Sequence, residues 1–274
     1  MTDNSDRRSI ELEVEVAGTP EQVWRAIATG PGISSWYVPH TVEEREGGSA
    51  SARFGPGPEM EIPGRVASWN PPRQVVFDGG EEVAGFAFEW TVEARGNGTC
   101  IVRLVNSGFG SGEEWDDQYD AMHEGWLIFL SNLRLHLEHH AGDTAVVGLP
   151  MTYVPVDADT AWAAMAAALG IPASAALGER IATAGDGVPR LVGTVAEIAN
   201  PHGIDRKNKF LLQLEEPAPG TAFIGAESHG GMSGISIWTY LYGDRAEAAT
   251  ASSKGEFQRI VEEVAAGFAP PDAG

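Results

Sequence analysis

The chain has 274 residues, of which 39 are acidic and 18 basic, so its formal net charge is −21. A surface this acidic repels phosphate backbones and anionic lipid headgroups, which argues against nucleic-acid binding and against a role at a membrane surface. The single cysteine, Cys100, excludes a disulfide scaffold, while the lack of a signal-peptide pattern or of about 18 consecutive apolar residues predicts a cytoplasmic protein.

The chain opens with a strand and a helix. Residues 10–16 alternate apolar side chains with glutamates, which is the period of a half-buried strand. Thr19, Pro20 and Glu21 then supply an N-cap, a proline suited to the first helical turn and an acid at the positive end of a helix. We expect that helix to end at Gly30-Pro31-Gly32.

Residues 40–106 predict several short strands separated by glycine and proline turns. In residues 86–93 the aromatic side chains fall on one face of a strand and the glutamates on the other. Gly96-Asn97-Gly98 predicts a tight hairpin into the next strand. Residues 115–140 follow with apolar positions three and four apart, which predicts one long helix of roughly seven turns.

The second half of the chain repeats this plan more faintly. A strand-like segment precedes a helical one in which Trp162 takes the place of Trp24, and residues 193–198 are similar to residues 64–69. Shared motifs in one order suggest a tandem duplication. We therefore predict two domains, residues 1–142 and a reduced second copy at residues 143–274.

The first half resembles a known family. Residues 16–27 followed by Trp36-Tyr37, residues 64–77, and the set Gly98-Thr99, Ser107-Gly108-Phe109 and Gly125-Trp126 resemble AHSA1-type members of the SRPBCC (START / Bet v 1-like) superfamily. The likeness covers about residues 9–140. It implies an α+β helix-grip fold, in which a curved antiparallel sheet surrounds a long C-terminal helix and an apolar cavity lies between them.

An aromatic set offers candidate walls for that cavity, because small-molecule sites are mostly apolar with few polar groups. The alternative is that these side chains simply fill the core. His123 and Arg103 are candidate polar contacts, although Arg103 also suits an ion pair with Glu89 or Glu93 across the hairpin. The expected ligand-binding residues are Trp36, Tyr37, Phe54, Trp69, Phe88, Trp90, Arg103, His123 and Trp126.

Metal and cofactor chemistry is not expected. His136, His139 and His140 lie near the end of the long helix, but this spacing alone indicates no metal site, and histidines suit a helix C-terminus. The glycine-rich segments lack the ending of a phosphate-binding loop. We predict no metal, no cofactor and no catalytic residue.

The function that follows is non-enzymatic binding of a hydrophobic or amphipathic small molecule in the N-terminal cavity. One alternative is an Hsp90-type chaperone partner or other protein-interaction module, since an acidic surface suits a basic partner. A second alternative is a cyclase-like or hydratase-like enzyme that uses His123 inside the cavity, where a carboxylate or tyrosine neighbour would tune its proton transfer.

Overall fold

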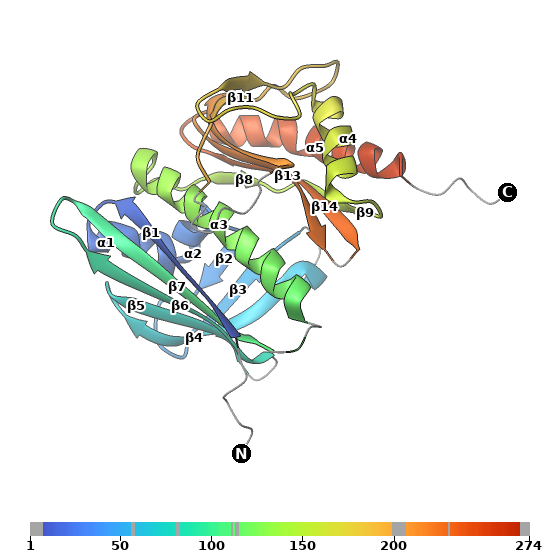
Figure 1. Ribbon diagram of the computed structural model, residues 1–274. Coiled ribbons are helices and arrows are strands. Elements are labelled where there is room, and N and C mark those ends of the chain that lie inside the picture. Colours follow the sequence, from blue (N-terminus) through green and yellow to red (C-terminus); the bar gives the residue numbers. More distant parts are fainter. Residues whose placement is uncertain are drawn as a thin grey trace. The chain divides into compact units, whose positions relative to one another are not determined.

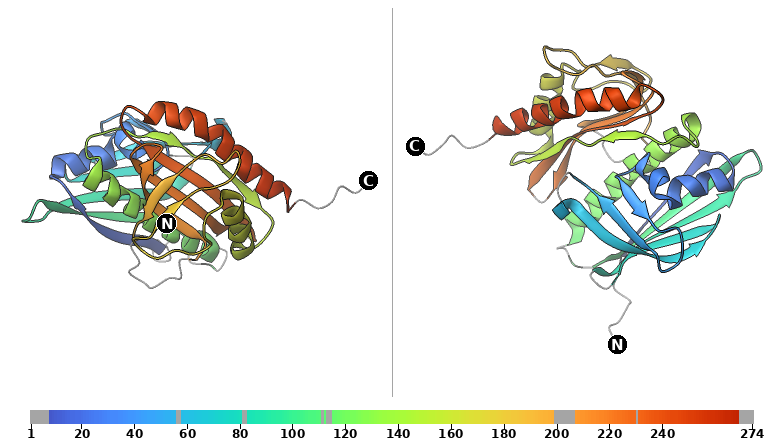
Figure 2. Two further views of the ribbon diagram at one scale, coloured as in Figure 1. Left: turned by 90° about the horizontal axis from the view of Figure 1, so that it is seen from above. Right: turned by 180° about the vertical axis from the view of Figure 1, so that it is seen from behind.

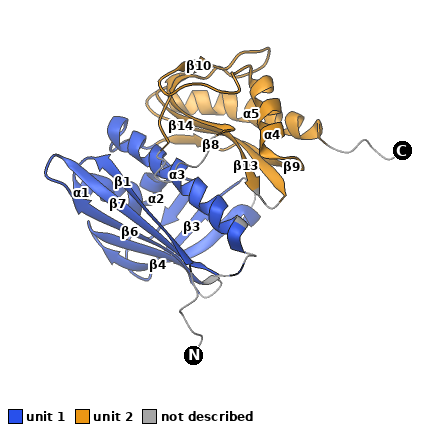
Figure 3. Cartoon of the chain, viewed as in Figure 1, with its two compact units in different colours: residues 1–144 blue, residues 145–274 orange. Residues whose placement is uncertain are grey.

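The computed structural model describes residues 8–55, 58–80, 83–110, 112, 115–198, 207–229 and 231–268. The chain divides into two compact units, residues 1–144 (unit 1) and residues 145–274 (unit 2), which Figure 3 shows in blue and orange. None of the helices in these ranges combines the length and the apolar character needed to cross a bilayer.

Unit 1 is a single antiparallel sheet with helices on one face. The first strand pairs with the last, and the remaining strands follow in sequence, in the order β1-β7-β6-β5-β4-β3-β2. Figures 1 and 2 show the long helix α3 lying across the curved sheet, with α1 and α2 near it. This architecture confirms the predicted α+β helix-grip class. The elements are β1 (Arg8–Ala17), α1 (Pro20–Ala28), α2 (Gly30–Ser34), β2 (His40–Val42), β3 (Ser49–Arg53), β4 (Glu61–Asn70), β5 (Gln74–Gly79), β6 (Val83–Ala94), β7 (Thr99–Phe109) and α3 (Asp116–His139).

The local sequence signals at the start of unit 1 are confirmed. In β1 every second side chain is buried and the intervening glutamates are exposed. Helix α1 begins with a capping box, in which Gln22 N donates to Thr19 Oγ1 and the Thr19 N–H donates to Gln22 Oε1. These reciprocal bonds satisfy two backbone donors that the helix start would otherwise leave without partners.

As the sequence predicts, the helix that begins at Pro20 stops at the glycine–proline segment, because α1 ends at Ala28 and Thr29 is extended. The segment Gly30-Pro31-Gly32 is itself helical. It forms the first turn of the short helix α2, where a proline is well tolerated. Thr29 caps this helix, because its hydroxyl accepts a hydrogen bond from the Gly32 N–H at 3.1 Å. The chain therefore turns between two helices at this point instead of leaving helical structure.

Gly32 lies against the backbone of α1. A Cβ atom at this position would stand 1.9 Å from the Arg25 carbonyl oxygen and 2.9 Å from the Ala26 Cα. Only a residue without a side chain permits this approach, since a real Cβ never comes so close to backbone atoms. The contact fixes where α2 leaves α1, and hence where residues 33–40 run.

Unit 2 contains a second antiparallel sheet, in the order β10-β11-β12-β13-β14-β8, with β9 also paired to β14. As in unit 1, the first strand segments lie beside the last strand. Its described residues place five strands between the helices α4 and α5, where unit 1 has six between α2 and α3. The tandem duplication itself stays a prediction. The elements are β8 (Val146–Gly148), β9 (Met151–Val154), α4 (Ala158–Leu169), β10 (Arg180–Ala182), β11 (Val192–Val195), β12 (Lys209–Glu216), β13 (Gly220–His229), β14 (Met232–Leu241) and α5 (Ala246–Ala266).

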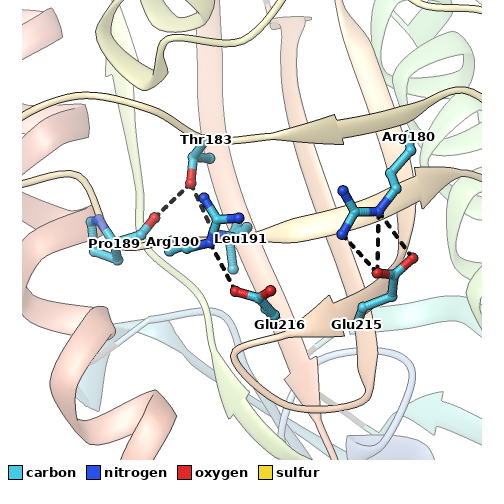
Figure 4. Close-up of polar contacts among 7 residues, drawn as sticks. All are labelled: Arg180, Thr183, Pro189, Arg190, Leu191, Glu215 and Glu216. Atoms are coloured by element: carbon cyan, nitrogen blue, oxygen red, sulfur yellow. Dashed lines mark hydrogen bonds and ion pairs between the residues drawn. The ribbon is translucent and has the colours of Figure 1, made fainter.

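A single threonine closes the loop between β10 and β11, as Figure 4 shows. The buried Thr183 hydroxyl donates to the Pro189 carbonyl oxygen at 2.7 Å and accepts from the Leu191 N–H at 2.8 Å. Two exposed ion pairs, Arg180 with Glu215 and Arg190 with Glu216, join the same edge to β12. Exposed pairs contribute little to stability, so the buried hydroxyl is the specific element of this edge.

Replacing Gly32 with alanine tests the close approach of α2 to α1. We expect Gly32→Ala to lower the free energy of unfolding by about 2–3 kcal/mol, the upper part of the usual range for overpacking, because the new methyl group meets backbone atoms. Chemical denaturation measures the change. Gly96→Ala is the matched control, since no atom lies within 4 Å of its added Cβ. Equal stability of the two variants would contradict the proposed constraint.

Candidate functional site

Unit 1 contains a partly open cavity of about 180 Å³ between the sheet and its helices. Aromatic and aliphatic side chains form most of the lining. The lining residues come from α1, α2 and the segment after it, strands β2 to β6 with the turn after β3, and α3. The lining residues are Ile27, Ile33, Trp36, Tyr37, His40, Ala50, Ser51, Ala52, Phe54, Ile62, Pro63, Gly64, Phe77, Asp78, Gly79, Phe86, Phe88, Trp90, Met122 and Trp126.

Most of the aromatic residues expected at the site come together in this lining. They come from the segment after α2, from the residue after β3, from β6 and from the middle of α3. The alternation predicted for β6 explains which of its residues line the cavity, because Phe86, Phe88 and Trp90 are two residues apart and share one face of the strand. The predicted residues that line the cavity are Trp36, Tyr37, Phe54, Phe88, Trp90 and Trp126.

Trp126 lies at the centre of the aromatic wall. Its ring centroid is 5.0 Å from that of Tyr37, 5.5 Å from that of Trp90 and 5.6 Å from that of Phe88. The contacts with Trp90 and Phe88 are edge-to-face, and so is the contact between Trp36 and Trp90 at 5.7 Å. Such geometry is preferred over face-to-face stacking and makes the wall rigid as well as apolar.

The protein itself satisfies the N–H groups of two of these indoles. Trp36 Nε1 donates to the Ala26 carbonyl oxygen at 2.9 Å, and Trp126 Nε1 donates to Asn106 Oδ1 at 3.2 Å. The buried side chain of Asn132 also donates to the Trp36 carbonyl oxygen at 2.9 Å. Both indoles therefore present carbon surface to the cavity, and their orientation is fixed by buried hydrogen bonds.

Two polar side chains in the lining, those of His40 and Tyr37, have groups without a hydrogen-bond partner among the described residues. His40 Nδ1 lies 2.7 Å from the Val38 carbonyl oxygen, which can only accept, so this nitrogen carries the proton and Nε2 is an acceptor. Burial lowers the pKa of His40 to about 4, so the ring is neutral at pH 7. Burial raises the pKa of the Tyr37 hydroxyl, and among the described residues it has no hydrogen-bond partner.

Asp78 is the one carboxylate among the lining residues. Arg65 holds it with two hydrogen bonds, of 2.7 and 3.2 Å, and the Gly80 N–H donates to it at 3.1 Å. The Arg65 guanidinium lowers the pKa of this carboxyl, so Asp78 is ionised. Lysine and arginine do not occur among the described lining residues.

The structure does not place Trp69, Arg103 or His123 in the lining. Trp69 packs edge-to-face on Trp24 of α1, with ring centroids 4.9 Å apart. Arg103 is 46% exposed and pairs with glutamates of β1, because its neighbours in β7 point inward and it points outward. His123 follows Met122 on α3, and one helical step turns it away from the cavity side that Met122 and Trp126 share.

The glutamates that pair with Arg103 also differ from those expected. Glu11 bonds the guanidinium and Glu13 lies 4.0 Å from it, whereas the sequence suggested Glu89 or Glu93. The ladder explains the difference, since β7 lies between β1 and β6 and its Arg103 stands directly opposite Glu13. Arg103 therefore forms an ion pair across strands, as the sequence suggested, but its partners lie on β1 and not on β6.

Unit 2 has a wide groove of about 730 Å³ beside α4 and β12, more open to solvent than the cavity of unit 1. Trp162 and Phe210 contribute apolar surface, while Asp159 and Lys209 are charged. Within the ranges that the structure describes, no three His, Cys, Asp or Glu side chains are grouped to hold a metal ion. The less open and more apolar cavity of unit 1 is therefore the best candidate site.

The neutral state of His40 can be tested by NMR. We expect the His40 imidazole to titrate near pH 4, because burial disfavours its charged form. An unfolded imidazole titrates near pH 6.5, so the unfolded chain binds the proton more tightly and stability falls as the pH drops from about 6.5 to 4.

His40→Asn identifies the resonance and keeps a side-chain N–H that can donate to the Val38 carbonyl oxygen. This variant should also flatten the loss of stability between pH 6.5 and 4 relative to the unaltered chain. A His40 resonance that titrates near pH 6.5 would contradict the assignment of a neutral acceptor.

Comparison with known proteins gives one family match. Residues 17–138 match the family model AHSA1, described as "Activator of Hsp90 ATPase homolog 1-like protein". No curated protein matches the chain. This match spans α1 to α3 and contains all twenty lining residues of the cavity.

Several solved structures are similar to the chain. Protein BH1534 of Bacillus halodurans has 22% identity and a TM-score of 0.43, covering 48% of this chain and 99% of its own. The Aha1 dimer from Colwellia psychrerythraea has 22% identity and a TM-score of 0.41, covering 49% and 99%. The di-domain ARO/CYC BexL from the BE-7585A biosynthetic pathway has 15% identity and a TM-score of 0.44, covering 96% and 100%.

The family match, the strand order of unit 1 and its long C-terminal helix agree with one another. Residues 17–138, from the end of β1 to the last turn of α3, match the AHSA1 family model and have a helix-grip fold.

Proposed function

We propose that unit 1 binds a small, largely apolar molecule in its cavity and does no chemistry on it. The observation that carries the proposal is the aromatic lining of this partly open cavity, in which two polar groups have no hydrogen-bond partner among the described residues. Apolar walls with a few placed polar groups are the usual form of a small-molecule site. A core that served packing alone would bring the same aromatic rings into contact without leaving space between them.

The volume of the cavity restricts the size of the ligand. A dry apolar cavity of about 150 Å³ is large enough to bind benzene, while pockets for drug-sized ligands begin at about 300 Å³. At about 180 Å³, the cavity of unit 1 matches a single six-membered ring with a small substituent. Larger ligands would extend beyond the cavity through its open side.

An enzymatic role for His123 has no support in this geometry. Proton transfer needs a group within hydrogen-bond reach of the substrate, and His123 is not among the residues that line the cavity. A protein-interaction role remains the rival hypothesis. It predicts that the surface of the domain, and not its interior, is the functional part.

Filling the cavity tests the proposal. We expect toluene at ten times its dissociation constant to raise the melting temperature of unit 1 by about 3–6 °C, through preferential binding to the folded state. Ala50→Leu should abolish this rise, because Ala50 is buried in the lining and a larger side chain occupies the ligand's space. Thermal unfolding of the full chain, followed with and without ligand, measures both effects.

Ala94→Leu is the control, since the same substitution falls on an exposed strand position outside the lining. It should leave the ligand-induced rise unchanged. A folded protein that shows no rise with any member of a broad single-ring panel would reject the cavity function and favour the protein-partner alternative.

A further inference from the structure

We propose that the cavity selects a neutral six-membered ring that carries one hydroxyl group, that is, a simple phenol. It would prefer this compound to the isosteric hydrocarbon and to an aryl carboxylate. The inference rests on the proposed function, and it adds the chemical class of the ligand. Three features of the lining carry it, namely the His40 acceptor, the Tyr37 hydroxyl and the charge of Asp78.

The first feature is a hydrogen-bond acceptor, the Nε2 atom of His40, for which a ligand can supply the donor. The hydrogen bond from His40 Nδ1–H to the Val38 carbonyl oxygen fixes the tautomer and leaves the Nε2 lone pair without a partner among the described residues. The backbone N–H of His40 is itself bonded to Ser34 Oγ, so the residue is held at both ends. A ligand that places an O–H or N–H group here gains a hydrogen bond, whereas a hydrocarbon displaces solvent from the acceptor without replacing its hydrogen bond.

The second feature is the Tyr37 hydroxyl, which can donate. The Tyr37 ring is packed against five other rings, including Trp126 at 5.0 Å and Phe129 at 4.4 Å, so the position of its hydroxyl is fixed. Its centroid lies 5.4 Å from that of His40, and both residues line the same cavity. A ligand hydroxyl can donate to His40 and accept from Tyr37, while a carbonyl group can only accept.

The third feature is electrostatic. Asp78 places a carboxylate at the lining, its Arg65 partner lies outside the lining, and no lysine or arginine occurs among the described lining residues. A ligand carboxylate would lose its hydration without gaining a cation, which is strongly unfavourable in an apolar site. Since His40 is uncharged, it offers no compensation. Charge therefore excludes benzoate, although its ring has the right size.

Binding of three probes of similar shape to the full-length protein tests this inference. Phenol and toluene differ only by the exchange of a hydroxyl for a methyl group, and benzoate adds a charge. Titration followed by the indole N–H resonances of Trp36, Trp90 and Trp126 gives each dissociation constant. We expect phenol to bind at least as tightly as toluene in spite of its greater cost of desolvation, and benzoate to bind at least tenfold more weakly than phenol.

Two variants examine the hydrogen bonds separately. Tyr37→Phe removes only the hydroxyl, and His40→Asn removes the Nε2 acceptor but keeps a donor for the Val38 carbonyl oxygen. Each should reduce the preference for phenol over toluene about two- to tenfold, the range expected for one net hydrogen bond, while the affinity for toluene stays the same. Tyr119→Phe is the matched control, because the Tyr119 hydroxyl donates to the Ser9 carbonyl oxygen outside the lining.

The outcomes separate the two proposals. If toluene binds more tightly than phenol and the ratio is unchanged in both variants, the hydroxyl preference is wrong and the cavity function stands. Tighter binding of benzoate than of phenol likewise overturns the inference. If the folded protein binds none of the three probes, the inference and the cavity function both fail.

Discussion

The position of the segment between α2 and β2 decides what the N-terminal domain can bind. Gly32 allows α2 to touch the backbone of α1, and the chain that leaves α2 carries Trp36, Tyr37 and His40 into the interior. Hydrogen bonds from the Trp36 indole to α1 and from Asn132 of α3 to the Trp36 carbonyl oxygen then hold this segment between two helices. The aromatic wall and both unpartnered polar groups depend on this one placement.

The interior of unit 1 combines rigid packing with two polar groups, on Tyr37 and His40, that have no hydrogen-bond partner among the described residues. Interlocked rings leave little freedom for side chains to collapse into the empty space, which is why a cavity can persist in an otherwise well-packed core. The same burial that excludes water keeps His40 uncharged and the Tyr37 hydroxyl protonated. Specificity in such a site comes from the hydrogen-bonding pattern of a neutral ligand and from the exclusion of charge, more than from attraction between ions.

The sequence predicted the parts of this domain that follow from regular periodicity. Alternation in β1 and β6, the cap at Thr19 and the spacing in α3 gave the correct elements, and the inward aromatic residues of β6 were correctly expected at the cavity. His40 was missed because it lies at the end of an irregular segment, where no period indicates the direction of a side chain. Asn106 and Asn132 gave only the weak signal of a polar residue inside an apolar run.

Trp69 and Arg103, which were expected at the cavity, lie outside its lining for two different physical reasons. Between Val66 and Ser68 the pairing of β4 with β5 shifts register, so alternation does not carry through to Trp69, which packs on α1. Arg103 follows the alternation of β7, which places its side chain on the outer face of the sheet. It was expected at the cavity because of its charge, but its position on the strand excludes that location. For Arg103, the alternation of inward and outward positions along the strand predicts the location better than the residue type does. The assignment of unit 2 as a second copy needs information on ancestry that strand order alone does not contain.

The arrangement of the indoles has a consequence for how this protein can be observed. Trp36, Trp90 and Trp126 line the cavity, and Trp90 is in edge contact with each of the other two indoles. The N–H groups of Trp36 and Trp126 donate to carbonyl oxygens of the protein. Any molecule that enters must touch these rings and change the dielectric around them. Their ultraviolet emission is therefore an intrinsic reporter of occupancy, and filling of the cavity can be followed on an unlabelled protein in real time.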